Sequence, residues 1–303
     1  MNPLPAFPPQ IYQFVRSVFR SANRRACEKL AVVPNCPEQS LDMTIIEHLS
    51  RYSGPRVIAA GWTVRIDVYY LGGLRHFYRW EIGDIGLLVF VKRRNSVFAN
   101  KVVILQSKRL YPNKGHVVEL TREDYTIGFG TLLPGASSLL PLSGHYKFPF
   151  TAASKYQALL VDDDQYKAIG HYESTHEIPV HYLLYNPWVL PVTYTFPVLR
   201  LPKLGAAANG GVRIAPAANV RKLLSGKGRG YAPSFSDLTH VVSKQNVHAS
   251  GWRLEHFMSS LVMRCQEGKL FPGLDDENIF ALFNRRSGPI AAAVAVTVEQ
   301  QGD

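Results

Sequence analysis

The sequence predicts an α/β protein in which helices flank a mixed central sheet. Two apolar runs, residues 85–91 and 102–105, enclose a polar and basic connection with an Asn-Ser turn, as in a β-hairpin. Upstream, residues 10–30 and 40–50 carry apolar side chains at helical spacing. A further run rich in β-branched and aromatic residues, 57–70, reads as another strand.

The composition is that of a folded, soluble chain. Of its 303 residues 46% are hydrophobic and 19% charged, so a sizeable core can be buried. We expect no stable membrane insertion, because no apolar run reaches the roughly 18 residues that a span needs. The opening "MNPLPAFPPQ" lacks a secretory pattern, and three scattered cysteines read as reduced thiols. These features predict a cytoplasmic protein.

The formal net charge of +11 favours a polyanionic partner. The alternatives are nucleic acid, an anionic membrane surface, or a basic protein with no such partner. Residues 10–30 add a basic amphipathic helix, whose apolar stripe is expected to dock on the main domain. A membrane-surface or targeting role of this helix stays open.

The chain divides on pattern into three parts. Residues 1–35 form the basic N-terminal arm, 36–200 the core, and 201–303 a basic loop followed by an α+β extension. Within the core we expect a helix over 151–162 and a short buried strand over 178–187. Beyond it we expect a loop over 200–236, a helix over 250–268 and a last strand from 290.

The stretch "KVVILQSKRLYP", residues 101–112, ends a buried strand in polar groups. Residues two apart in a strand share a face, so Gln106 and Lys108 point the same way. Antiparallel pairing of the two apolar runs would set Asp84 beside them. A carboxylate and an amide oxygen are ligands that Mg²⁺ accepts, together with waters and substrate phosphate. An adjacent ammonium suits phosphodiester hydrolysis.

The segments "GDIGLLVFV" and "KVVILQSKR" resemble the D…(E/Q)xK core of the PD-(D/E)xK nuclease superfamily, in particular Mrr-like restriction endonucleases. The motif covers residues 84–111, and with the flanking elements the resemblance extends over 38–190. It implies a restriction endonuclease-like fold and a Mg²⁺- or Mn²⁺-dependent DNA endonuclease of a restriction or phage-defence (antiviral) type.

Carried over by position, the resemblance assigns Asp84, Gln106 and Lys108 to catalysis, with Asp84 and Gln106 on the metal. Many members add a glutamate on the first helix, for which Glu47 is the better candidate and Glu38 the second. Glu81 competes with Asp84 as a metal ligand, because residues three apart in a strand face opposite ways.

Glutamine at position 106 departs from the acid of the family prototype and is a weaker metal ligand. The alternatives are therefore a non-catalytic nucleic-acid-binding or complex-forming subunit, or a nuclease directed at RNA. Since the chain has no NTP-binding motif, translocation would need a partner ATPase or another defence-system subunit. A homodimer would suit double-strand cleavage.

Basic residues outside the motif are candidates for phosphate contacts. Some interleave with aromatic residues before the hairpin, where core packing is the alternative, and others lie in a segment free of acids. The set is Arg75, Arg79, Arg109, Arg213, Arg221, Lys222, Lys227 and Arg229. The histidines of "HEIPVH" are five apart across a proline, which excludes a helical zinc motif, and we interpret them as structural.

Overall fold

The structure is a computed structural model. It describes residues 6–70, 82–93, 96–113, 146–196, 198, 203–206, 208–239, 251–271 and 290–301. Its helices are α1 (Pro9–Val32), α2 (Glu38–Ser50), α4 (Asp164–His176), α5 (Ala217–Leu224), the short α6 (Leu254–His256) and the π-helix η3 (Phe257–Val262). Its strands are β1 (Arg56–Ala59), β2 (Trp62–Tyr70), β3 (Gly83–Arg93), β4 (Ser96–Arg109), β5 (Tyr146–Phe150), β6 (Val180–Tyr185), β7 (Val192–Phe196), β8 (Arg213–Pro216), β9 (Trp252–Arg253), β10 (Lys269–Phe271) and β11 (Ile290–Gln300).

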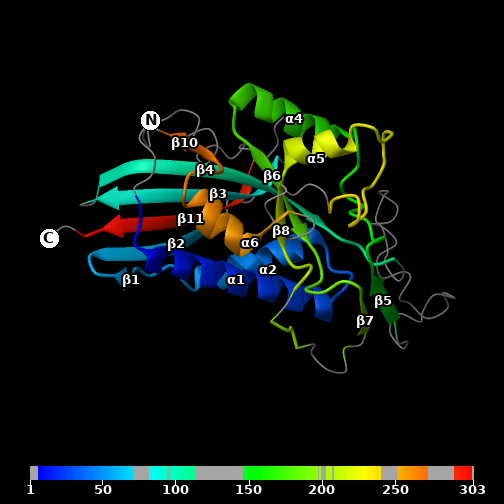
Figure 1. Ribbon diagram of the computed structural model, residues 1–303, viewed down its shortest axis with the longest axis horizontal. Coiled ribbons are helices and arrows are strands. Elements are labelled where there is room, and N and C mark those ends of the chain that lie inside the picture. Colours follow the sequence, from blue (N-terminus) through cyan, green and yellow to red (C-terminus); the bar gives the residue numbers. More distant parts are fainter. Residues whose placement is uncertain are drawn as a thin grey trace.

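A large mixed sheet crosses the molecule, which confirms the α/β class (Figure 1). Its strand order is β1-β2-β11-β3-β4-β6-β8-β9, and β10 pairs with the first half of β4. β3 and β4 form the predicted antiparallel hairpin, with Ile85 opposite Leu105. β4 and β6 run parallel and are connected through α4, the crossover that a parallel pair requires.

The C-terminal strand β11 lies between β2 and β3, antiparallel to the first and parallel to the second. Residues 201–303 were predicted as an extension of the core, and this placement corrects that division. Every side chain from Ala292 to Val298 is buried, in keeping with a central strand. The sheet is therefore built from strands of both the middle and the C-terminal part of the chain.

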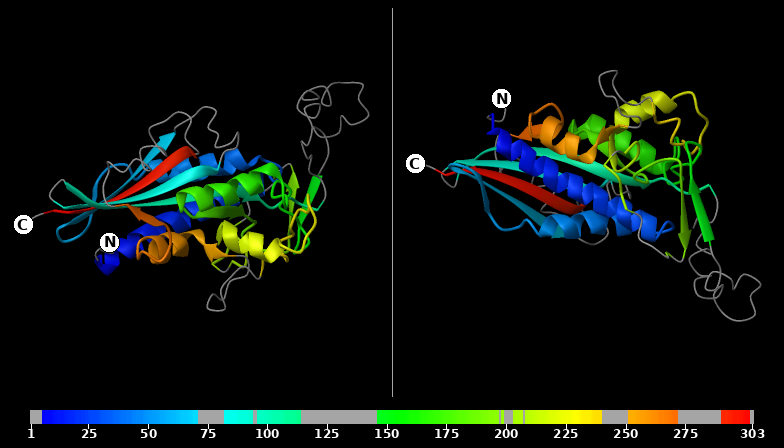
Figure 2. Two further views of the ribbon diagram at one scale, coloured as in Figure 1. Left: turned by 90° about the horizontal axis from the view of Figure 1, so that it is seen from above. Right: turned by 60° about the horizontal axis from the view of Figure 1, so that its bottom comes forward.

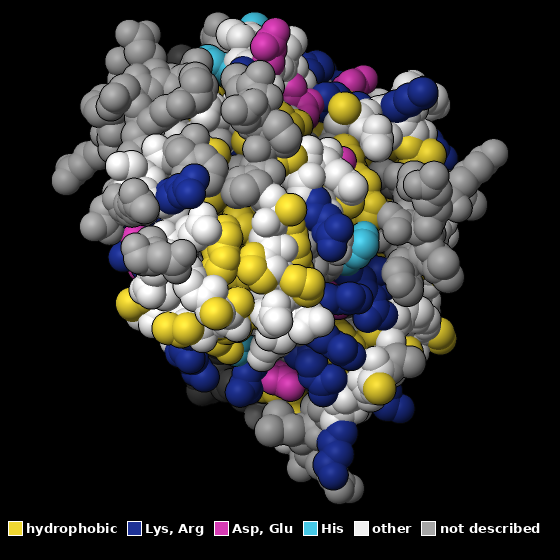
Figure 3. All heavy atoms as spheres, turned by 60° about the vertical axis from the view of Figure 1, so that its left-hand side comes forward, with side chains coloured by type: hydrophobic (Ala, Val, Ile, Leu, Met, Phe, Trp, Pro, Cys, Tyr) yellow, Lys and Arg dark blue, Asp and Glu magenta, His cyan; other side chains and the backbone are white. Residues whose placement is uncertain are grey.

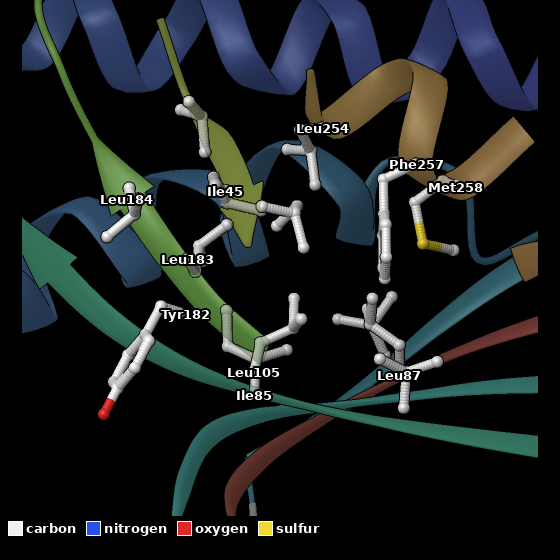
Figure 4. Packing of buried hydrophobic residues seen from close by; sticks show 14 of the residues in the cluster. Ile45, Ile85, Leu87, Leu105, Tyr182, Leu183, Leu184, Leu254, Phe257 and Met258 are labelled. Atoms are coloured by element: carbon white, nitrogen blue, oxygen red, sulfur yellow. The ribbon is translucent and has the colours of Figure 1, made fainter. Parts of the chain in front are cut away.

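Alternating side chains of the sheet meet different helices. Leu105 and Ser107 of β4 face α2, whereas Gln106 and Lys108 face the side where α4 lies. Figure 4 shows the α2 side, where Ile45 and Phe257 reach from the helices toward strand residues such as Leu105. The Tyr182 ring points away from Ile45 and Phe257 in the same view.

α1 covers the same side as α2 and packs between α2 and the pair α6 and η3 (Figure 2). Its apolar stripe is buried and its arginines are mostly outside that stripe, so the predicted docking of the basic helix on the main domain is confirmed. Among the described residues no helix is both long enough and apolar enough to span a bilayer.

Several local predictions were wrong. Residues 57–70 do not form one strand but contribute to the antiparallel pair β1 and β2, with a turn at Ala60 and Gly61. Residues 151–162 form turns rather than a helix, and α4 begins only at Asp164, where the Asp163 side chain accepts from the Tyr166 N–H at 2.7 Å. The predicted loop over 200–236 contains β8 and α5. Pairing of β8 with β6 buries residues whose local sequence, rich in Gly, Ala and Pro, reads as irregular.

Candidate active site

The hairpin of β3 and β4 brings Asp84 against Gln106, as its predicted register requires. The Gln106 Nε2 donates to Asp84 Oδ2 at 2.5 Å, and the Ser107 backbone N–H donates to the same oxygen at 2.7 Å. Asp84 is half-buried, whereas Gln106 is 3% exposed. The carboxylate is therefore fixed at the end of the hairpin by two donors from the neighbouring strand.

Lys108 lies further along the same face of β4 and is 4% exposed. Its Nζ donates to Gln165 Oε1 of α4 at 2.8 Å and lies 3.9 Å from Glu38 Oε2 of α2. Glu38 also accepts from the Arg109 backbone N–H at 2.9 Å through its other oxygen. The ammonium is thus held between a carboxylate and an amide from two different helices.

The structure brings Glu38, and not Glu47, to the site. Glu38 is the first residue of α2 and faces the end of β4, whereas Glu47 lies near the other end of the helix with its side chain in solvent. This corrects the preferred assignment of the helix glutamate in favour of the second candidate. Glu81 lies outside the described residues.

Asp42 is a site residue that the sequence analysis missed. It lies one helical turn after Glu38 in α2, and its Oδ1 accepts from the Ser107 Oγ at 2.5 Å and from the Tyr185 hydroxyl at 2.6 Å. Complete burial raises the pKa of the Asp42 carboxyl well above its usual range, and the nearby Asp84 charge raises it further. An acidic residue beside Leu41 on the apolar stripe of a predicted helix was the available signal.

Replacing Asp42 with asparagine is expected to remove a pH dependence of stability. Because the folded-state pKa is raised, the native protein still holds a proton above pH ~3.9, where the unfolded chain has released it. The free energy of unfolding therefore falls as the pH rises from ~3.9 to the folded-state pKa. The asparagine side chain would keep an oxygen for Ser107 and Tyr185 without the buried charge. Free energies of unfolding in urea from pH 4 to 8 should increasingly favour Asp42→Asn over wild type.

The exposed Asp162 provides the matched control for this experiment. Its left-handed backbone, with φ of 57°, also suits asparagine. Asp162→Asn should run parallel to the wild type across the pH range. A pH profile of Asp42→Asn parallel to both would show that Asp42 does not hold a proton in the native state.

The donor set at Asp84 is compatible with a weakly held Mg²⁺ ion. The Gln106 Oε1 is buried and has no hydrogen-bond partner in the part of the chain that the structure describes, so a cation or its hydration shell would satisfy it. No group of three or more His, Cys, Asp or Glu side chains that could hold a metal occurs among these residues. Mg²⁺ needs only one or two carboxylates when waters and substrate phosphate complete its shell. Asp84 supplies one such carboxylate, and the Gln106 oxygen could join it only if the amide turned, because its Nε2 donates to Asp84.

Two of the residues predicted to contact nucleic acid are buried. Arg109 is 1% and Arg213 0% exposed. The Arg109 guanidinium donates to the backbone carbonyls of Pro34 and Cys36, and the Arg213 Nε donates to that of Gly210 at 2.8 Å. Both predictions are corrected, because these side chains bind the protein's own backbone.

The other residues predicted to contact nucleic acid differ in their exposure. Arg221 is half-buried and paired with Glu173, while Lys222, Lys227 and Arg229 are exposed around the end of α5. Lys227 lies 3.9 Å from the Asp237 carboxylate and over the Tyr231 ring. Arg75 and Arg79 lie outside the described residues.

The buried His181 has its Nε2 3.1 Å from Glu267 Oε2 and packs edge-on against Phe257, an environment that fits the structural role predicted for it.

Searches of protein-family models, curated proteins and solved structures gave no match to this chain. The function of this chain must therefore be inferred from the chemistry of the site itself.

Proposed function

We propose that this protein is a Mg²⁺-dependent endonuclease with a restriction endonuclease-like core, and that DNA is its substrate. One observation carries the proposal: Asp84, Gln106, Lys108 and Glu38, from two strands and a helix, converge at the end of the β3–β4 hairpin. The net charge of +11 is consistent with a polyanionic substrate. A restriction or phage-defence role in the cytoplasm, and assembly as a homodimer, extend the same proposal.

In this proposal each side chain has a distinct task. Asp84 and Gln106 would hold the metal ion, which when bound polarises the phosphodiester and lowers the pKa of a coordinated water. The Ser107 N–H already orients the Asp84 carboxylate, whereas the Gln106 amide would have to turn its oxygen toward the ion, because its Nε2 donates to Asp84. Lys108 would orient the attacking water or neutralise charge on the phosphate as the bond to the leaving oxygen breaks. Glu38 and Gln165 position its ammonium.

The second candidate is a non-catalytic nucleic-acid-binding or complex-forming subunit on the same fold. The near-complete burial of Gln106 and Lys108 favours it, because a phosphodiester must reach both groups for hydrolysis. So does the hydrogen bond from the Gln106 amide to Asp84, in which the amide nitrogen occupies the position that a cation would take.

A nuclease assay separates these candidates. The full chain is incubated with supercoiled plasmid, linear DNA and total RNA, each with Mg²⁺, Mn²⁺ or EDTA. We expect nicked or linear plasmid products with either metal and none with EDTA. If RNA is cleaved while DNA stays intact, the protein is an RNA-directed nuclease. Salt-sensitive binding without cleavage under any metal would favour the non-catalytic subunit.

A further inference from the structure

A cavity of about 380 Å³ lies where the start of α1 meets η3. The first turns of α1 form one wall through Tyr12, Gln13 and Arg16, and the other wall contains Ser259, Ser260 and Arg264. Its volume falls in the range of roughly 300–1,000 Å³ that is usual for small-ligand sites. None of its residues belongs to the candidate active site.

Each of the two walls of the cavity carries one arginine. Arg16 and Arg264 are both exposed, and neither has an acidic side chain within ion-pair distance among the described residues. Burial lowers the pKa of the neighbouring His256, the Arg16 charge lowers it further, and the Glu255 charge opposes this shift. Figure 3 views this end of the molecule, with Lys and Arg side chains gathered on its surface.

The Arg264 guanidinium is preorganised. Its Cζ lies 4.5 Å from the centre of the Tyr12 ring, and the Tyr12 hydroxyl is itself fixed because it accepts from the Phe7 backbone N–H at 3.2 Å. An arginine that stacks on an aromatic ring keeps its N–H edge available and loses less conformational entropy on binding an anion.

Neutral donors add to this positive surface. The Ser259 Oγ donates to the Glu255 carbonyl at 2.8 Å, so the half-buried Ser260 hydroxyl is the donor in its 3.3 Å contact with Ser259. On anion binding the Ser260 proton would turn from Ser259 toward the ligand. The start of α1 has neither a side-chain cap nor an acidic residue in its first turn, so the positive end of a 24-residue helix is not neutralised locally.

We propose that this cavity binds a phosphate group of a nucleotide or nucleic acid, with Arg16 and Arg264 as its two clamping cations and Ser260 as a hydrogen-bond donor. The two arginines line the same cavity from α1 and from the segment after η3, and we expect a phosphate or diphosphate bound there to contact both. Planar, multi-donor guanidinium groups match phosphate oxygens better than they match a monovalent anion such as chloride. The site is independent of metal-dependent cleavage at Asp84.

The test measures binding of three probes to the full chain by titration calorimetry in EDTA: inorganic pyrophosphate, ATP and a single-stranded oligonucleotide. Arg16→Gln and Arg264→Gln are each expected to weaken binding by about 10-fold or more, and Ser260→Ala by about 3-fold. Arg20→Gln is the matched control, because Arg20 is exposed on the same helix but does not line the cavity. It removes the same charge and should change the dissociation constant less than about 2-fold.

The probes also identify the source of the phosphate. Pyrophosphate and ATP binding that both arginine variants weaken would assign the cavity to free nucleotides, whereas sensitivity confined to the oligonucleotide would assign it to a nucleic-acid backbone. Equal losses in Arg16→Gln, Arg264→Gln and Arg20→Gln would overturn the proposal, since only net charge would then matter. Absence of any measurable binding would overturn it as well. Because EDTA is present and no bond is cleaved, none of these outcomes depends on nuclease activity.

Discussion

Replacement of Lys108 by alanine is expected to lower metal-dependent DNA cleavage by about 10²–10⁴-fold, the usual contribution of a positioned acid–base or charge-stabilising group. The reason is the fixed position of its ammonium, 2.8 Å from Gln165 Oε1 and 3.9 Å from Glu38 Oε2, on the same strand face as Gln106. Initial rates of plasmid nicking at saturating Mg²⁺ measure the loss. Asp84→Ala should abolish cleavage similarly, because it removes the only carboxylate assigned to the ion.

The control for Lys108 is Lys167, an exposed residue on α4, close in sequence to Gln165. Lys167→Ala also removes one positive charge, from α4 itself. It should leave the cleavage rate within about 2-fold of wild type, as expected for a surface substitution. Far-UV circular dichroism and the unfolding midpoint of each variant separate a chemical defect from misfolding. Wild-type cleavage by folded Lys108→Ala would exclude the assigned role.

The positions of Asp84, Gln106 and Lys108 were accessible to sequence reasoning because they depend on one local hairpin. A side-chain period of two fixes which residues share a face, but the turn alone does not fix the register. Arg93 pairs with Ser96 at the turn, and a bulge next to Val91 shifts the register by one residue, so that Ile85 pairs with Leu105. This shift brings Asp84 against Gln106. Little long-range information was needed.

The helix contribution was less predictable. Glu38, Asp42 and Glu47 all belong to α2, and the helical period alone does not say which end of the helix meets the end of β4. The choice depends on the chain segment between α1 and α2, whose carbonyls are held by Arg109. Tertiary packing thus decided between Glu38 and Glu47.

The position of β11 in the sheet could not be predicted from the sequence, for a different reason. Its apolar sequence predicts a strand, but the partners of a strand are set by contacts across most of the chain, here β2 and β3. A short terminal run of alanines and valines fits an edge or a centre equally well until the whole sheet is known. The division at residue 200 treated nearness in sequence as nearness in space.

Arg109→Ala is expected to destabilise the native protein by about 2–5 kcal/mol, because two buried carbonyls lose a charged donor at roughly 1–3 kcal/mol each. The guanidinium is 1% exposed, donates to the carbonyls of Pro34 and Cys36, and stacks at 4.3 Å on the Tyr111 ring. Alanine leaves both carbonyls without that donor and a cavity behind them. The free energy of unfolding from urea titration measures the effect.

Two further variants make this prediction specific. Arg109→Lys should recover only part of the loss. An ammonium can donate to carbonyls, but it lacks the fixed fork of the guanidinium and its planar stacking on the Tyr111 ring. Arg20→Ala, at an exposed position of α1, should change stability by less than about 0.5 kcal/mol. If Arg109 instead contacted nucleic acid, Arg109→Ala would weaken DNA binding and leave stability unchanged. Since its guanidinium ties the segment between α1 and α2 to the end of β4, we expect the opposite: lost stability together with a misplaced Glu38.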